Sequence, residues 1–261
     1  MQLYTETSEL EYTTETKFSA DERALSILRK HGKVFRISSV IKPTVASLII
    51  NQNRDNNPSF TEGKSDPVAW NTIESSATNN NANSTKEDLI AWSTLSRLID
   101  RKMVRHLTRG VAMINDEPNS EYLDLSIVGT RIPNGVICLV SSLYFHDLTT
   151  EIPHAVYVAL GKTKRYPKID FPPVRVFRFS GLAQSDGIEH HKIDDVDVKI
   201  YSVAKTIVDC FKFRNKIGLS IAMNALKEGL KSRKTTRSEI VKYAAMLRMY
   251  NVMKPYLQAF S

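Results

Sequence analysis

The residues best suited to chemistry in this 261-residue sequence are the cations between positions 89 and 115. The segment carries Asp100 as its one carboxylate, which leaves it with a charge of +4. Its cations are Arg97, Arg101, Lys102, Arg105 and Arg109. A short and strongly cationic segment suits the binding of a phosphate backbone. A small helical cap with an ordinary solvated face is the alternative, and the segment alone leaves both interpretations open.

A second group of cations lies near the end of a predicted helix that starts at Ser202. It comprises Lys205, Lys212, Arg214, Asn215 and Lys216, with Asn215 as the uncharged member and Asp209 as the opposing carboxylate. Cations near a helix C-terminus interact favourably with the helix dipole, by about 0.3–1 kcal/mol each. Exposed together, the same side chains would form an edge that binds an anion or an acidic partner.

Residues with catalytic potential form no recognisable site. The sequence contains no Walker loop, no dinucleotide-binding glycine motif and no zinc-protease or nucleophile-elbow motif. His190 and His191 precede three aspartates, but adjacent residues of a strand face opposite ways and cannot easily share a metal ion. His146 is expected as a structural group at a helix end.

The two cysteines, Cys138 and Cys210, lie in apolar strings and are expected to be reduced and buried. We therefore expect no enzyme, no cofactor and no metal. The alternative is an enzyme that acts on nucleic acid and uses the basic segment only to hold its substrate.

Composition excludes several classes of protein. Hydrophobic residues make up 42% and charged residues 25%, as in globular proteins, and the net charge is +8. The longest apolar run is far shorter than the roughly 18 residues that span a bilayer. The acidic start of the chain lacks the apolar region of a secretory signal. We therefore expect a cytoplasmic protein without membrane contact.

The N-terminal half has the order of a winged helix-turn-helix domain. We expect a flexible acidic lead-in over residues 1–19, and this domain over 20–116, with a polar insertion at about 44–88. The predicted elements are a helix stopped by Gly32, a short extended piece, a helix opened by Ser38 or Ser39, a cationic helix over 89–103 capped at Ser93, and a hairpin turning near Arg109. In that geometry the third helix enters the major groove.

Residues 117–261 are expected to form a second domain in which strands precede helices. A helix over 120–133 is followed by candidate strands at 135–140, 155–160, 174–179, 188–193 and 196–201, with a short helix from Ser141 or Ser142 after the first strand. Four helical stretches follow from Ser202, and Thr236 with Glu239 makes a capping box for the third. The fold class predicted for the whole chain is α+β.

Three phrases of the C-terminal half resemble the AbiEi family of antitoxins, over residues 131–260. They are VICLVSSLYFHDLTTEIPHAVYVAL, FPPVRVFRFSG and YSVAKTIVDCFKFRNKIGLSIAMNALKEGL. The phrases ALSILRKHGKVFRISSVI and IAWSTLSRLIDRKMVRHLTRGVAMI look like the winged-helix domain of that family. The insertion at 44–88 departs from the tight connection that the family usually has between its second and third helices.

The resemblance implies a bacterial antitoxin of a type IV toxin–antitoxin system, with a role in phage defence. Such a protein represses its own operon by binding inverted repeats in the upstream operator DNA, and it counteracts a cognate nucleotidyltransferase-like toxin. The groove-facing start of the family's recognition helix falls on Trp92, Ser93 and Thr94, with Arg97 one turn later. Its basic hairpin falls on Arg105 and Arg109. Antitoxin activity is assigned to the C-terminal half, where we expect the group around Lys212 to serve it.

Overall fold

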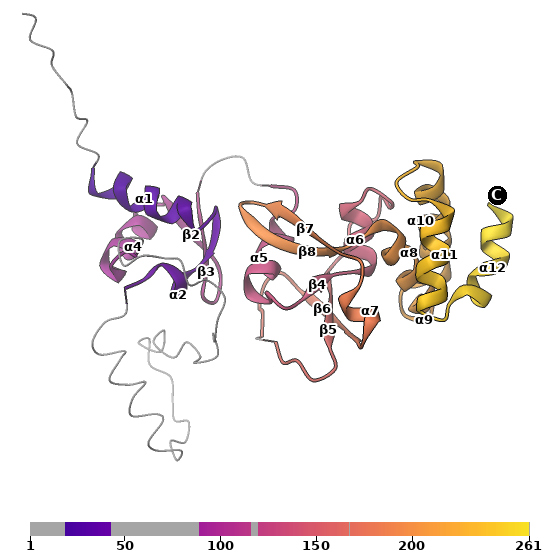
Figure 1. Cartoon of the computed structure of the whole chain (residues 1–261). Coiled ribbons are helices and arrows are strands. Elements are labelled where there is room, and N and C mark those ends of the chain that lie inside the picture. Colours follow the sequence, from indigo (N-terminus) through magenta and orange to yellow (C-terminus); the bar gives the residue numbers. More distant parts are fainter. Residues whose placement is uncertain (1–18, 43–88, 116–119, 167, 261) are drawn as a thin grey trace, which may run out of the picture.

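The computed structural model describes residues 19–42, 89–115, 120–166 and 168–260 (Figure 1). Its fold class is α+β, with two separate sheets. The expected lead-in, apart from Ser19, and the expected insertion at about 44–88 lie outside the described residues. Within those ranges, no helix is long and apolar enough to cross a membrane.

The N-terminal part packs helices on one face of a three-stranded antiparallel sheet. Its described elements are α1 (Ala20–Lys30), β1 (Val34–Arg36), α2 (Ile37–Val40), α4 (Trp92–Asp100), β2 (Val104–Thr108) and β3 (Val111–Ile114). β3 is the central strand, between β1 and β2. The buried core between sheet and helices includes Leu28, Phe35, Val40, Leu95, Leu98, Ala112 and Ile114. The cationic segment is thereby held on a packed scaffold.

The first helix begins and ends as its sequence dictates. The Ser19 hydroxyl accepts a hydrogen bond from the Glu22 backbone N–H, and the Glu22 carboxylate accepts one from the Ser19 N–H. This capping box satisfies two backbone donors of the first turn. Gly32, at φ +98°, then turns the chain away in a conformation that L side chains rarely adopt. The predicted stop at Gly32 is confirmed.

The two other predicted helix starts of this part are wrong by one or two residues. α2 starts at Ile37, ahead of Ser38 and Ser39, and the Ser39 hydroxyl instead donates to a backbone carbonyl at 2.8 Å. Ser93 lies within the first turn of α4, which starts at Trp92 and has no side-chain cap. The side chain at the start of α2, Ile37, is buried in the core, so packing overrides the preference of serine for the N-cap there.

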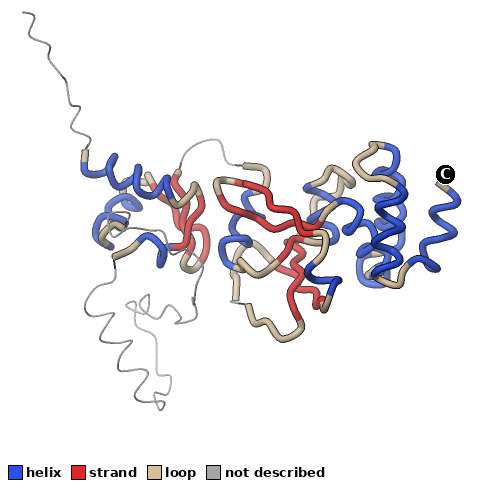
Figure 2. Tube along the Cα trace, viewed as in Figure 1, coloured by secondary structure: helices blue, strands red, loops and turns tan. Residues whose placement is uncertain are grey.

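The C-terminal part is built on a mixed five-stranded sheet. Its elements are α5 (Leu123–Arg131), β4 (Val136–Ile137), α6 (Leu139–Phe145), β5 (Val156–Gly161), β6 (Val174–Phe179), α7 (Leu182–Ser185), β7 (Ile188–Ile193), β8 (Val196–Tyr201), α8 (Val203–Lys212), α9 (Arg214–Ile217), α10 (Leu219–Lys231), α11 (Arg237–Met246) and α12 (Tyr250–Ala259). The strand order is β6-β5-β4-β8-β7, in which β5–β6 and β4–β8 are parallel. Figure 2 shows the helices after β8 gathered at the end opposite the N-terminal part.

Helices cover both faces of this sheet. On one face α5 contributes Leu125 and Val128 to a core with Val158 and Ile200. On the other, α6 and α8 pack against the sheet with α10, α11 and α12 behind them. The capping box that Thr236 forms with Glu239 at the start of α11 is confirmed. The predicted strands after 150 and the last three helical stretches after Ser202 are also confirmed, whereas the first stretch, residues 202–216, divides at Phe213 into α8 and α9.

The first predicted strand of this part is much shorter than expected. Only Val136 and Ile137 are extended, and α6 already starts at Leu139 instead of at Ser141 or Ser142. The strand and the first five residues of the helix are all buried, so the apolar run has no exposed face that would reveal its period. The four-residue helix α7 was not predicted.

The two parts are joined through the outer face of the N-terminal sheet. Val34, Val111 and Met113 point away from α1 and α4, and they are buried against Leu123 of α5 and Val196 of β8. Both faces of the small sheet are therefore covered, one by its own helices and the other by the C-terminal part. Since the contact is apolar and closed, it couples the two parts mechanically.

Two polar features fix the geometry of this junction. The Arg36 guanidinium donates to the carbonyls of Thr130 (2.6 Å) and Arg131 (3.1 Å) and thus caps the C-terminus of α5 with a positive charge. Gly32 lies so close to the β7–β8 turn that a Cβ there would approach Asp195 to 3.1 Å. A side chain at this position would push the two parts apart.

Replacing Met113 with aspartate together with Arg105→Gln tests the junction. Arg105 is replaced because its guanidinium donates to the Met113 sulfur at 3.3 Å and would pair with a carboxylate at that position. Burial of the unpaired carboxylate in this closed apolar contact should lower the free energy of unfolding by at least about 3 kcal/mol, and calorimetry should resolve two transitions where the wild type shows one. The matched control is Met103→Asp with Arg105→Gln, because Met103 is 37% exposed, and it should change stability by no more than about 0.5 kcal/mol. One unchanged transition in the Met113 variant would contradict the coupling.

Candidate nucleic-acid interface

The helix α4, which opens the cationic segment, has a buried stripe and an exposed polar face. Leu95 and Leu98 are fully buried, as the sequence predicts. Trp92 is 47% exposed, Ser93 is exposed and Thr94 is half-buried. A large exposed indole at the start of a helix that also presents hydroxyl groups is suited to contact with a flat or apolar partner surface, including base edges.

Arg97 of α4 and Arg101, the residue that follows this helix, are anchored by one carboxylate. Asp21 of α1 is nearly buried, with 7% of its side chain exposed, and it pairs with Arg97 Nε at 2.9 Å and with Arg101 Nη1. One negative charge against two guanidinium groups leaves a net positive charge on the surface. Each guanidinium has five N–H donors, so pairing with Asp21 orients both groups and still leaves donors free for a partner. The side chain of Arg97 is 43% exposed and that of Arg101 is 60% exposed.

Asp21 is a residue of this candidate interface that the sequence did not single out. An acidic residue in the first turn of a helix has a sufficient explanation in the helix dipole, so the sequence alone gave no reason to pair it with arginines some 80 positions away. The structure brings α1 and α4 together and supplies that reason.

The hairpin after α4 carries the remaining cations of the segment. Its turn lies at Arg109 and Gly110, as predicted. Arg105 and Arg109 are exposed, and the Arg105 guanidinium donates to the Met113 sulfur at 3.3 Å. Lys102, in the tight turn between α4 and β2, is exposed as well. The cations of α4 and of the hairpin therefore reach solvent.

Burial gives the titratable groups of the C-terminal part structural roles. His146 at the end of α6 contacts the Tyr201 carbonyl through Nε2 at 2.8 Å, and burial lowers its pKa. Burial raises the pKa of the Cys138 and Cys210 thiols well above the usual range, which keeps them protonated and poor nucleophiles. The predicted structural roles of His146 and both cysteines are confirmed.

The histidine pair on β7 does not converge on a common point. His190 pairs with Asp197 at 2.8 Å, whereas His191 lies against Glu189 at 3.2 Å and against the Phe145 ring. Over the described ranges, no three histidine, cysteine or acidic side chains gather where they could hold a metal ion.

Lys205 does not belong to an exposed cationic edge, and this expectation is wrong. Its side chain is fully buried and pairs with the equally buried Asp209, one turn along α8. Its ammonium lies over the Tyr201 ring, 4.0 Å from the centroid, and faces the Phe179 ring at 5.1 Å. Burial lowers the pKa of Lys205 and raises that of Asp209 to about 6. The aromatic rings and the carboxylate replace water around the ammonium, so no partner can reach it.

The rest of that group lies at the surface where α8 gives way to α9. Lys212, Asn215 and Lys216 are exposed, whereas the half-buried Arg214 donates to the Phe211 carbonyl at 2.9 Å. Lys216 also lies beside the rings of Phe177 and Phe213. The structure thus leaves Lys212, Asn215 and Lys216 available to a partner and gives Arg214 a partly structural role.

Comparison with models of known protein families and with curated proteins finds no match for this chain.

Variants of the buried pair Lys205–Asp209 separate the contribution of packing to stability from that of charge. Lys205→Met leaves the Asp209 carboxylate buried without its cation and should cost about 3–5 kcal/mol at pH 7, whereas Lys205→Met with Asp209→Leu should be close to neutral or stabilising. Chemical denaturation of both variants measures the difference. Lys212→Gln, at an exposed position of the same helix, is the control and should lie within about 0.5 kcal/mol of the wild type.

The stabilities of the single and the double variant should differ in their dependence on pH. Because burial raises the folded-state pKa of Asp209, its protonated form favours folding, and the associated stability is lost as pH rises through that pKa. Without Lys205 that pKa rises further, so the single variant should regain stability at pH 5. The double variant should show no such recovery. Equal pH dependence of the two would contradict the buried pairing.

Proposed function

We propose that the N-terminal part is a winged helix-turn-helix that binds duplex DNA upstream of its own operon, and that the chain is a DNA-binding antitoxin of the AbiEi type. In this proposal the protein represses that operon, and its C-terminal part counteracts a cognate nucleotidyltransferase-like toxin. The resemblance described in the sequence analysis gives the antitoxin component, and the arrangement of the N-terminal elements supports the DNA-binding component.

The observation that supports the proposal is the order of the N-terminal elements around α4. The order α1, β1, α2, α4, β2, β3, with the strand order β1-β3-β2, agrees with the order expected for a winged helix-turn-helix. In such a domain the helix before the hairpin enters the major groove. That helix is α4, which carries Arg97, is followed directly by Arg101 and Lys102, and starts at the exposed Trp92.

The anchored arginines favour DNA over a less specific anionic partner. Asp21 holds Arg97 and Arg101 side by side, which lowers the entropic cost of presenting them to a base edge or to phosphates. Arg97, one turn beyond Ser93 and Thr94, is the proposed base reader. Lys102, Arg105 and Arg109 carry charge beyond the helix and are proposed to contact the phosphate backbone, which fixes the register of the protein on the duplex.

DNA binding is tested by a gel-shift titration against the upstream DNA and a scrambled duplex of equal length. Arg97→Ala should weaken binding to the upstream sequence by about 1–3 kcal/mol and leave the scrambled duplex nearly unaffected. Arg105→Ala and Arg109→Ala should weaken both duplexes alike, and each should flatten the plot of log affinity against log salt by about one unit.

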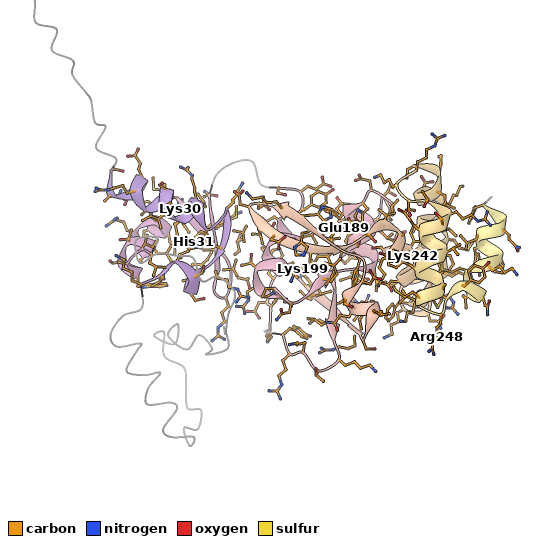
Figure 3. All side chains as sticks on the ribbon, in the orientation of Figure 1. Lys30, His31, Glu189, Lys199, Lys242 and Arg248 are labelled. Atoms are coloured by element: carbon orange, nitrogen blue, oxygen red, sulfur yellow. The ribbon has the colours of Figure 1, made fainter. Side chains whose placement is uncertain are left out.

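The control is Lys242→Ala on α11, far from α4 (Figure 3), which should change neither affinity nor slope. Wild-type binding that does not distinguish the two duplexes, or that does not change with salt, would disprove the DNA-binding proposal.

The antitoxin component is tested at the exposed cations of the α8–α9 corner. Lys212→Glu combined with Lys216→Glu should abolish rescue of toxin-expressing cells, because charge reversal repels an acidic protein surface or an RNA, and it should spare operator affinity. Both residues are exposed and make no ion pair within the described part of the chain. The matched control reverses Lys227 and Lys231 on α10. Full rescue by the first variant at normal abundance would leave the corner with no role beyond that of a solvated helix end.

A further inference from the structure

The strand β6 forms one outer edge of the five-stranded sheet. In the described sheet, whose strand order is β6-β5-β4-β8-β7, its neighbour is β5, which lies beside it (Figure 1). The parallel pairing with β5 covers all of Val174–Phe179 and contains no register shift. The strand consists of valine, phenylalanine and arginine, and the first two favour extended backbone. β6 is therefore a regular edge strand, of the kind to which another strand can be added.

Alternate residues of β6 direct their backbone polar groups away from the sheet. The Val156 N–H donates to the Pro173 carbonyl at 2.8 Å, so from Pro173 onward every second residue faces β5. The residues between them, Val174, Val176 and Arg178, direct their N–H and C=O groups to the outer edge. Within the described ranges these groups have no hydrogen-bond partner in the protein. They are available to water or to another strand.

The two arginines of β6 do not protect this edge. Charged side chains on an edge strand usually discourage the addition of a second strand. Here, however, Arg175 donates to the Tyr157 hydroxyl at 3.0 Å, and its guanidinium lies 5.3 Å from the centre of that ring. Arg178 donates to the carbonyls of Gly161 (2.9 Å) and Lys164 (2.5 Å). Both guanidinium groups thus bind to β5 and to the loop after it, within their own chain.

The opposite edge of the sheet is protected by charge. There β7 exposes Glu189, His190 and Lys192, and His190 pairs with Asp197 of β8 at 2.8 Å. A strand that approached β7 would meet charges of both signs and would have to displace water from them. Of the two edges of this sheet, β6 is therefore the one suited to pairing.

The sequence of β6 is complementary to itself in an antiparallel pair centred on Val176. In that register Val174 of one copy lies opposite Arg178 of the other, and Val176 lies opposite its own counterpart. The outward-facing groups of all three residues then meet in hydrogen-bonded pairs, each of which exchanges two N–H···O bonds. Arg175 lies opposite Phe177, so no arginine is directly opposite another. A second β6 thus satisfies the edge without placing like charges face to face.

The same register covers two exposed apolar side chains beyond the ends of the strand. Phe171, ahead of β6, is 51% exposed, and Leu182, after it, is 65% exposed. Residues 171 and 181 are equally far from Val176 along the chain, so the register brings Phe171 of one copy to Gly181 of the other, beside Leu182. A Cβ at Gly181 would have no atom within 4 Å, which leaves room there for an aromatic ring. Burial of both side chains would favour the pairing.

We propose that β6 is a self-association surface, through which two copies of this chain form a twofold-symmetric dimer. The contact joins their two five-stranded sheets into one continuous sheet. Because the contact is one strand wide, it is small, and we expect a dissociation constant of about 1–100 μM. The inference is independent of the proposed DNA binding, and its test uses the protein alone.

Cysteine cross-linking of the full chain tests the register. Val176→Cys places a thiol opposite its own counterpart at a Cα separation of about 5.5 Å, which a disulfide can span. Mild oxidation should convert most of this variant to a covalent dimer on a non-reducing gel. Val174→Cys is the matched control, because it is also half-buried but its counterpart lies about 14 Å away along the strand, so it should stay monomeric. The native Cys138 and Cys210 are buried and do not compete.

Sedimentation velocity around the expected dissociation constant tests the dimer itself. Val176→Pro removes an outward-facing N–H and leaves the hydrogen bonds to β5 intact, so it should weaken the dimer at least about tenfold. Val176→Thr keeps the N–H and the branched Cβ, and it should associate like the wild type. If Val176→Pro fails to fold, the cross-linking pair decides.

Three results would overturn the self-association surface. One is a wild type that stays monomeric far above the expected dissociation constant. The others are a dimer whose affinity Val176→Pro leaves unchanged, and cross-linking of Val174→Cys as fast as that of Val176→Cys. None of these results bears on DNA binding, which the titration with upstream and scrambled duplexes decides separately.

Discussion

The arrangement of this protein depends on burial of both faces of its small N-terminal sheet. One face, with Phe35, Ala112 and Ile114, closes the core beneath α1 and α4. The other, with Val111 and Met113, is closed by α5 and β8. A three-stranded sheet with one solvated face would leave the N-terminal part free to move on the rest of the chain. With both faces covered, the orientation of α4 is fixed by the C-terminal part.

Carboxylates decide which cations can act on a partner. Asp209 and the surrounding aromatic rings retain Lys205 in the interior, where it has no contact with solvent. Asp21 has the opposite effect, because its position at the base of α4 orients Arg97 and Arg101 and leaves them partly exposed. Net charge alone therefore says little about binding, and the position of each carboxylate says more.

Periodicity and capping predicted most elements of the fold from the sequence. Gly32, the turn at Gly110 and the capping box at Thr236 are local signals, and each was correct. The length of β4 and the depth of Lys205 were mispredicted because both depend on what packs around them. A buried strand and a buried helix are equally apolar, so a short apolar run does not distinguish them. The sequence also does not show whether a lysine such as Lys205 is exposed to solvent or buried beneath an aromatic ring such as Tyr201. The site was likewise predicted in part, since its cations are local but Asp21 is distant.

Backbone hydrogen exchange of the full chain, with and without its upstream duplex, tests the central claim most directly. The account predicts that the duplex slows exchange in peptides that cover α4 and the turn at Gly110, while α10–α12 are unchanged. A scrambled duplex should protect the same peptides less. Unchanged exchange at α4, or protection confined to α10–α12, would contradict the claim that this helix reads DNA.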